Sequence, residues 1–232
     1  LEGFWAVGTV VIALAAWLAS LYVPDGAWRW IFVLTAAPAL IGIWLRLWVP
    51  DSPLFLLRAG RVDAARSVLD TVLVTNGKDP LPPEQTLAVP PVAASPRLFS
   101  PALRQRSLVV LLVWFLVSVS YYGVFTWLPA RLAEDGFGYV RGYGFLVLVA
   151  LAQIPGYVLA GWGVEAWGRK PTLIAFLLLS AAGCLLFVVA GNGVLVGAAI
   201  LLMSFALLGT WGALYAFTPE LYPTAARATG MG

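Results

Sequence analysis

Six long apolar runs constrain this chain more than any other feature of its sequence. Each is uncharged or nearly uncharged, and they cover about residues 3–23, 30–49, 108–129, 142–164, 172–190 and 194–217. A hydrocarbon core about 30 Å thick needs about 20 helical residues, because every backbone polar group in lipid must be satisfied within its own segment. The runs lack the two-residue alternation of a membrane β-barrel. The sequence therefore predicts an all-α, polytopic membrane protein with six transmembrane helices.

The composition agrees with this reading and argues against other classes of protein. Hydrophobic residues make up 61% of the chain and charged residues 11%, which leaves too few polar side chains to cover a water-soluble domain. The basic residues are spread among loops with acids between them, so we expect no nucleic-acid partner. An enzyme of the membrane interior needs acids, His or Cys clustered at depth. The chain has no His and a single Cys in an apolar run, so we predict no enzymatic activity, metal or cofactor.

The distribution of Lys and Arg predicts the orientation in the membrane. Positive charge is retained in cytoplasmic loops. If residues 46–107 are cytoplasmic, the alternation of spans puts residues 165–171 and 218–232 on the same side. That side holds eleven of the 14 Lys and Arg residues, and the other side holds three. We therefore expect a multi-pass protein of the cell inner (plasma) membrane with these three segments, and the Leu1 end of the first span, in the cytoplasm.

A polar segment divides the spans into a pair before it and four after it. PDSPLFLLRAGR predicts a short helix with Asp51 or Ser52 as its cap and Gly60 at its end, and RVDAARSVLDTVLV predicts a second, amphipathic helix. Seven prolines between residues 80 and 101 cannot continue a helix. They predict an extended, mobile linker.

A charged turn separates two of the apolar runs at GWGVEAWGRKPTL, residues 161–173. Gly161, Glu165, Gly168, Arg169 and Lys170 fall in register with the signature loop of the major facilitator superfamily, although Glu165 stands where Asp is usual and the next residue is Ala where Arg is usual. PDSPLFLLRAGR resembles the family's segment after its sixth span. PELYPTAARATGMG resembles the segment between its tenth and eleventh. With three motifs in the right order, the chain resembles this family over essentially its whole length.

The resemblance implies a twelve-helix fold of which these six runs are spans five to ten. Residues 1–50 are then the last two spans of the N-terminal half, residues 51–106 the central cytoplasmic loop with short helices and a Pro-rich linker, and residues 107–232 the first four spans of the C-terminal half. We expect a fragment of a transporter that works in the lipid bilayer by alternating access, as a monomer when full length. Cations beside helix ends can pair with acids of neighbouring loops and so close the cytoplasmic side.

Charges and a tight turn at the predicted cytoplasmic ends of the spans indicate a gate. The reversal between two spans needs Gly168, and Glu165 is expected near the positive N-terminal end of the first span. The positive-inside bias alone is the competing explanation for the two cations of the turn, and a structural bend is the competing explanation for PELYPTAARATG. The predicted gate comprises Glu2, Glu165, Gly168, Arg169, Lys170, Glu220 and Arg227.

Polar and aromatic side chains at membrane depth predict where a substrate binds. Gln153 and Tyr157 share one face of a helix that we expect Pro155 and Gly156 to interrupt, which frees backbone groups near a cavity. Packing and interfacial aromatic belts are the competing explanation for these side chains. The residues predicted to bind substrate are Gln153, Tyr157, Tyr121, Tyr122, Thr126, Trp211, Tyr215 and Trp17.

The expected substrate is a small organic solute. Sugar porters of the superfamily carry Gln and Asn before a Tyr-Tyr pair where this chain has Leu111, Leu112 and Val117, which argues against a sugar. WAVGT and YYGVFTWLP are more similar to bacterial metabolite–proton symporters for organic or aromatic acids, including nicotinate-type permeases. No ionisable residue that could carry a proton lies in mid-membrane, so facilitated diffusion stays open beside proton coupling. The alternatives are a multidrug or other metabolite exporter, a sugar transporter of the same superfamily, and a non-transporting membrane sensor of the same fold.

Overall fold

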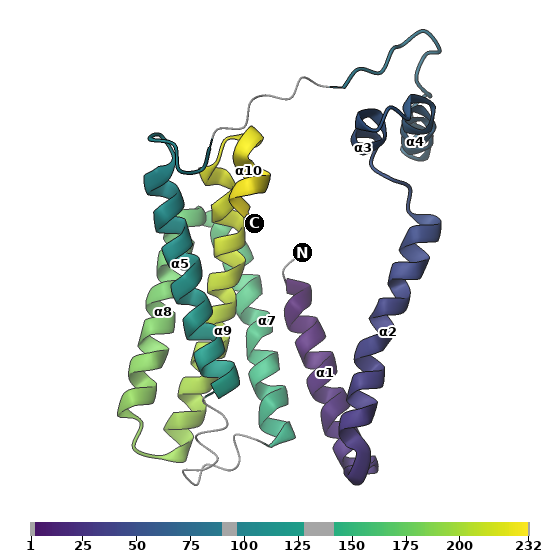
Figure 1. The fold of residues 1–232 in the computed structure, drawn as a ribbon. Helices are drawn as coiled ribbons and strands as arrows, with labels where there is room; N and C mark the ends of the chain where they lie inside the picture. The colour runs from purple at the N-terminus through teal and green to yellow at the C-terminus, as the bar shows by residue number, and fades with distance from the viewer. Residues whose placement is uncertain (1–2, 90–96, 128–141, 232) are drawn as a thin grey trace. The chain divides into compact units, whose positions relative to one another are not determined.

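The computed structural model describes residues 3–89, 97–127 and 142–231, which form helices and connecting turns (Figure 1). Within these ranges six helical segments are long and apolar enough to cross a membrane. They are α1 (Gly3–Tyr22), α2 (Ala27–Trp48), α5 (Arg104–Tyr122) with the π-helix Gly123–Trp127, α7 (Tyr143–Ala166), α8 (Arg169–Val189) and α9 (Gly193–Phe217). The six predicted spans are confirmed, and the tight connection between the first two is the 3-10 turn Pro24–Gly26.

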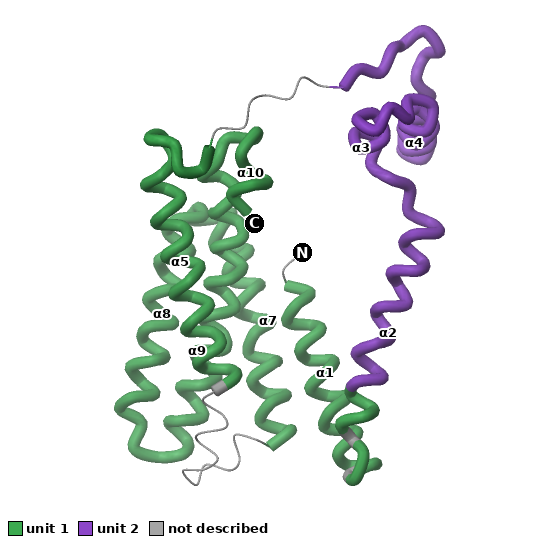
Figure 2. Tube along the Cα trace, viewed as in Figure 1, with its two compact units in different colours: residues 1–31, 94–232 green, residues 32–93 purple. Residues whose placement is uncertain are grey.

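The chain divides into two compact units (Figure 2). One unit comprises residues 1–31 and 94–232, and the other comprises residues 32–93. The described residues of the predicted substrate site and gate all belong to the first unit.

Helix α9 forms the centre of the first unit, with α7 and α8 packed against it. Small residues let the backbones approach, as is common between membrane helices. A Cβ on Gly156 of α7 would lie 2.2 Å from the Phe205 carbonyl oxygen of α9, and a Cβ on Gly209 of α9 would lie 2.0 Å from the Phe176 ring of α8. The Ser204 hydroxyl of α9 also donates a hydrogen bond of 2.7 Å to the Val149 carbonyl of α7. The three helices therefore form one tightly packed set.

Helix α7 runs without a break through Pro155, so the predicted interruption is wrong. The adjacent Gly156 does not loosen the helix. It provides the close contact with α9, because no side chain larger than hydrogen fits against the Phe205 carbonyl. Helix α1 packs against another side of α7. Its Ala6 is fully buried, and its Gly3 lies opposite Tyr157.

The reversal between α7 and α8 consists of Trp167 and Gly168 alone. Gly168 has φ +94° and ψ 165°, a conformation that is essentially restricted to glycine. Both turn residues donate backbone hydrogen bonds to the Gly163 carbonyl, at 2.8 and 3.2 Å. The predicted requirement for glycine at this turn is confirmed.

The segment after α9 folds back on the start of α5. It consists of the 3-10 helix η4 (Thr218–Leu221) and α10 (Thr224–Met231). The buried Tyr222 hydroxyl donates a hydrogen bond of 3.2 Å to the Ser107 hydroxyl of α5. A Cβ on Gly230 would lie 2.5 Å from the Tyr222 ring, so α10 closes over this side chain.

The second unit contains the two predicted short helices, α3 (Pro53–Arg58) and α4 (Val62–Thr75), which pack through Leu56 and Ala65. Gly60 ends α3 with φ +74°, as predicted, and the hydrogen bonds from the Arg61 and Gly60 amides complete a Schellman motif. Ser52 occupies the N-cap position of α3, but its side chain forms no capping hydrogen bond, so the predicted side-chain cap is wrong. Pro53 satisfies the first position instead.

The linker after α4 is not extended over its first part, which corrects the prediction for those residues. Arg66 donates hydrogen bonds to the carbonyl oxygens of Pro82, at 3.0 Å, and Gln85. The Asp70 carboxylate accepts a hydrogen bond of 2.8 Å from the Leu81 amide. Two charged side chains thus hold residues 81–85 against α4.

Candidate functional site

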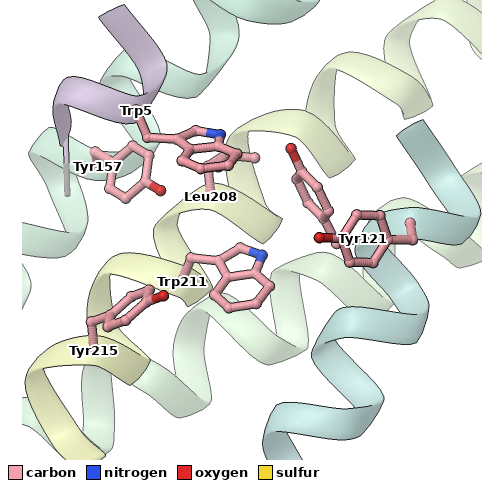
Figure 3. Close-up of a pocket in the computed structure, with 7 residues that line it drawn as sticks. Trp5, Tyr121, Tyr157, Leu208, Trp211 and Tyr215 are labelled. Carbon is pink, nitrogen blue, oxygen red and sulfur yellow. The ribbon is translucent and has the colours of Figure 1, made fainter. Parts of the chain in front are cut away.

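An aromatic cavity of about 140 Å³ lies among α1, α5, α7 and α9 (Figure 3). Six of its seven lining side chains are aromatic, four of them tyrosines and two tryptophans, and each carries a hydroxyl or an indole N–H group that can form hydrogen bonds. The lining residues are Trp5, Tyr121, Tyr122, Tyr157, Leu208, Trp211 and Tyr215. No charged side chain lines the cavity in the part of the chain that the structure describes.

Helix α9 supplies one wall of the cavity from a single face. Leu208, Trp211 and Tyr215 are spaced three and four residues apart, which places them one above another on a helix. Gly212 lies beside the same face, and a Cβ there would be 3.0 Å from the Tyr157 ring. The missing side chain lets Tyr157 of α7 lie directly against α9.

The opposite wall comes from the end of α5. The Tyr121 ring lies edge-on to Trp211, with centroids 6.0 Å apart, and against Phe125 at 4.8 Å. Tyr122 extends the wall and lies edge-on to Tyr121 at 5.3 Å. Contacts of this kind fix ring orientations, because the positive edge of one ring meets the negative face of the next.

Trp114 supports the cavity from outside it. Its ring lies edge-on to both Trp211 and Tyr215, at centroid distances of 5.2 and 4.9 Å. Its indole N–H donates a hydrogen bond of 3.0 Å to the Thr218 hydroxyl at the start of η4. Sequence reasoning missed Trp114, Trp5 and Leu208; only Leu208 carried a signal, its spacing of three residues from Trp211.

The structure brings five of the eight predicted binding residues together around the cavity: Tyr121, Tyr122, Tyr157, Trp211 and Tyr215. Gln153 lies one helical turn from Tyr157 but does not line the cavity. Trp17 is twelve residues, about 18 Å, further along α1 than Trp5, and Thr126 is exposed in the π-helix after α5. Neither side chain lines the cavity.

Gln153 has an unusual environment for a polar side chain. Its side chain is only 2% exposed, and its Oε1 atom has no hydrogen-bond partner among the described residues. A buried acceptor without a partner costs about 1–3 kcal/mol relative to a paired one. Among the described residues this oxygen is therefore a buried acceptor without a donor.

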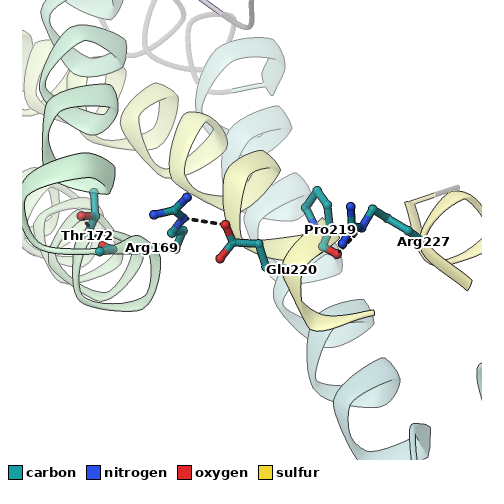
Figure 4. Close-up of polar contacts among 6 residues, drawn as sticks. Arg169, Thr172, Pro219, Glu220 and Arg227 are labelled. Atoms are coloured by element: carbon teal, nitrogen blue, oxygen red, sulfur yellow. Dashed lines mark hydrogen bonds and ion pairs between the residues drawn. The ribbon is translucent and has the colours of Figure 1, made fainter. Parts of the chain in front are cut away.

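One ion pair of the predicted gate forms (Figure 4). Arg169 Nε donates a hydrogen bond of 2.7 Å to Glu220 Oε1, and both side chains are about half exposed. The contact joins the start of α8 to η4, so the turn at residues 165–170 and the segment at residues 218–227 emerge at the same end of the unit. Arg227 instead donates a hydrogen bond of 2.9 Å to the Pro219 carbonyl.

The predicted six-residue charge cluster does not assemble among the described residues, which is a correction. Glu165 and Lys170 are exposed and form no ion pair with a described residue, and Glu2 lies outside the described residues. Glu165 is eight residues, about 12 Å, further along α7 than Tyr157, which faces Gly3. The expected proximity of Glu165 to the first turn of α1 is therefore wrong.

Comparisons with known proteins agree with this architecture. The family model described as "Sugar (and other) transporter" matches residues 2–232. The chain is 36% identical over 237 residues to the niacin transporter NiaP of Acinetobacter baylyi, covering 100% of this chain and 53% of that protein. It is 35% identical over 232 residues to the putative niacin/nicotinamide transporter NiaP of Bacillus subtilis, covering 100% of this chain and 51% of that protein.

Two further comparisons are more distant. The chain is 30% identical over 256 residues to the synaptic vesicle 2-related protein of Xenopus laevis, covering 100% of this chain and 46% of that protein. The structure is similar to the partially occluded inward-open conformation of the xylose transporter XylE from E. coli, with a TM-score of 0.66, 20% sequence identity and coverage of 99% of this chain and 51% of that one. The chain spans about half the length of the relatives that it matches.

Proposed function

We propose that this chain carries the solute-binding surface of a twelve-span secondary transporter. The premise is that the chain belongs to the sugar (and other) transporter family within the major facilitator superfamily. It is a multi-pass membrane protein of a transporter family and not an enzyme. The aromatic cavity is the proposed solute site. It is the observation that carries the proposal, because it joins α1 to α5, α7 and α9 with side chains suited to a planar ligand.

The proposed substrate is a small aromatic acid of the niacin type. A cavity of about 150 Å³ accommodates a benzene ring, so the 140 Å³ between these helices suits one six-membered ring. The rings of Trp211 and Tyr121 both line the cavity and can contact such a ligand through their faces and edges. Tyrosine hydroxyls and indole N–H groups can donate hydrogen bonds to its carboxylate. The identity of 36% to a protein named as a niacin transporter supports the same choice.

Proton coupling is the proposed means of handling the charge of the acid. No Lys or Arg lines the cavity in the described part of the chain, and an unpaired carboxylate in a low-dielectric site is costly. Entry of the acid with one proton removes this cost. The proposed location is the inner membrane, with residues 46–107, 165–171 and 218–232 in the cytoplasm, and the proposed role of Arg169 and Glu220 is to hold α8 to η4 when the cytoplasmic side closes.

The test is uptake of radiolabelled nicotinate into cells that produce the twelve-span protein and lack other nicotinate uptake. Loss of the Trp211 ring removes one wall of the site, so Trp211→Ala is expected to lower kcat/KM about tenfold or more. Trp162→Ala is the matched control, because Trp162 is an exposed tryptophan of α7 that does not line the cavity. Xylose uptake and drug efflux are measured in the same cells. Efflux of lipophilic drugs without nicotinate uptake would overturn the proposal in favour of an exporter.

A further inference from the structure

A second hollow of the molecule lies at the end of the unit where α5 and α8 begin. It is a groove of about 420 Å³ between α5, α8 and the last turns of α9. Its floor is apolar and includes the buried side chains of Val110, Leu173 and Leu214. Its rim is polar and carries Gln105, Arg106 and Lys170. The groove contains none of the residues that line the aromatic cavity.

The two cations on the rim form no ion pair with a described residue. Arg169, beside Lys170 in the sequence, is engaged by the Glu220 carboxylate, which is the acid of the neighbouring η4 segment. Arg106 and Lys170 have exposed side chains, and neither forms a hydrogen bond or ion pair among the described residues. Both lie in the first turn of their helices, where the helix dipole adds to the positive potential. The rim is therefore an unneutralised positive site above an apolar trough.

We propose that this groove binds an anionic phospholipid of the adjoining leaflet, with the phosphate between Arg106 and Lys170 and an acyl chain along the floor. The two parts of the groove match the two parts of such a lipid. Basic residues at a membrane surface attract anionic headgroups, and the apolar floor offers a chain contacts that a free anion does not use. The rim residues lie in the first turns of α5 and α8, at the end of the spans where a headgroup lies. The proposal does not depend on which solute the aromatic cavity carries.

The test measures binding of spin-labelled phosphatidylglycerol, and of phosphatidylcholine with the same chains, to the purified twelve-span protein in detergent. We expect an immobilised component for phosphatidylglycerol that inorganic phosphate at the same concentration does not displace. Removing one cation near a membrane surface lowers anionic lipid binding about fivefold, so Arg106→Gln and Lys170→Gln should each have this effect. Arg104→Gln is the matched control, because Arg104 starts the same helix but does not line the groove.

A steric variant tests the apolar floor separately. Val109 lines the groove and is 55% exposed, so Val109→Trp fills space without disturbing a buried contact. It should lower phosphatidylglycerol binding while both cations remain. Equal binding of the two lipids, equal losses in Arg104→Gln and Arg106→Gln, or displacement of the lipid by phosphate alone would each overturn the proposal. Size-exclusion profiles of the variants establish that they are folded.

Discussion

Arg169 and Glu220 are 51 positions apart in the sequence and share a hydrogen bond of 2.7 Å across the space between α8 and η4. Both belong to the C-terminal spans, so the pair fixes these spans to one another. It cannot by itself connect them to the first two spans of the chain. A gate that depends on this contact must therefore act through the position of η4, at the end of α9, relative to α8.

Breaking this pair should loosen the proposed cytoplasmic side. An exposed ion pair contributes about 0.2–1 kcal/mol, so Arg169→Ala should raise maleimide labelling of a cysteine placed at Tyr215, in a Cys184→Ser background, by no more than about fivefold. The charge reversal Arg169→Glu with Glu220→Arg should restore the original rate. Lys170→Ala, which removes a cation without a described partner, should leave labelling unchanged. Unchanged labelling in Arg169→Ala refutes the gate.

A methyl group at Gly156 should destabilise the packing of α7 on α9. The new Cβ would lie 2.2 Å from the Phe205 carbonyl oxygen, which is backbone and cannot rotate away. Overpacking of this kind costs about 1–3 kcal/mol or more. Thermal unfolding in detergent should show a lower midpoint for Gly156→Ala than for Gly161→Ala, a control on the same helix with no atom within 4 Å of the new Cβ. Equal midpoints would contradict the close contact.

The turn at Gly168 should reject every side chain. Its φ of +94° with ψ of 165° lies outside the left-handed helical region that asparagine tolerates. Gly168→Ala and Gly168→Asn should therefore both lower stability, by about 1–3 kcal/mol. Gly144→Ala, inside α7 and without close neighbours, is the control. Rescue by asparagine in the unfolding measurement would show that the turn has a different conformation.

Replacement of Gln153 separates its structural and functional roles. Leucine has a similar size and no acceptor, so Gln153→Leu should leave thermal stability unchanged or raise it, because the unpaired Oε1 is removed. If Gln153 accepts a hydrogen bond from the solute during transport, nicotinate uptake falls in the same variant. A variant that is destabilised and transports normally would assign the side chain to packing alone.

The positions of the spans could be predicted because the thickness of the bilayer sets the length of a spanning helix, and an apolar run of that length is visible in the sequence. The ends were less predictable. Helix α5 begins at Arg104, four residues before the apolar run, since charged residues at a membrane surface continue a helix that lipid no longer requires to be apolar. The hydrogen bonds that join Arg66 and Asp70 to residues 81–85 could not be predicted. The sequence of a proline-rich segment does not indicate which side chains elsewhere in the chain will bind its backbone.

The binding residues could be predicted as pairs on helix faces but not as a site. Gln153 and Tyr157 are four residues apart, as are Trp211 and Tyr215, and this spacing places each pair on one face of its helix. The spacing does not determine which face of the helix lines a cavity. That choice depends on contacts such as the one between Gly212 and Tyr157. Trp5 escaped prediction because its sequence context does not differ from that of a tryptophan facing lipid.

The position of Trp114 has a thermodynamic corollary. Its ring packs against two lining residues of the α9 wall, Trp211 and Tyr215, and its indole N–H donates a hydrogen bond to Thr218, two positions before Glu220. Trp114 thus connects the cavity wall to Thr218, and the backbone of η4 continues from Thr218 to Glu220 of the ion pair. If the cavity and the ion pair are coupled through this connection, the coupling is reciprocal. The factor by which bound solute raises the equilibrium constant for forming the Arg169–Glu220 pair then equals the factor by which the formed pair raises the affinity for solute.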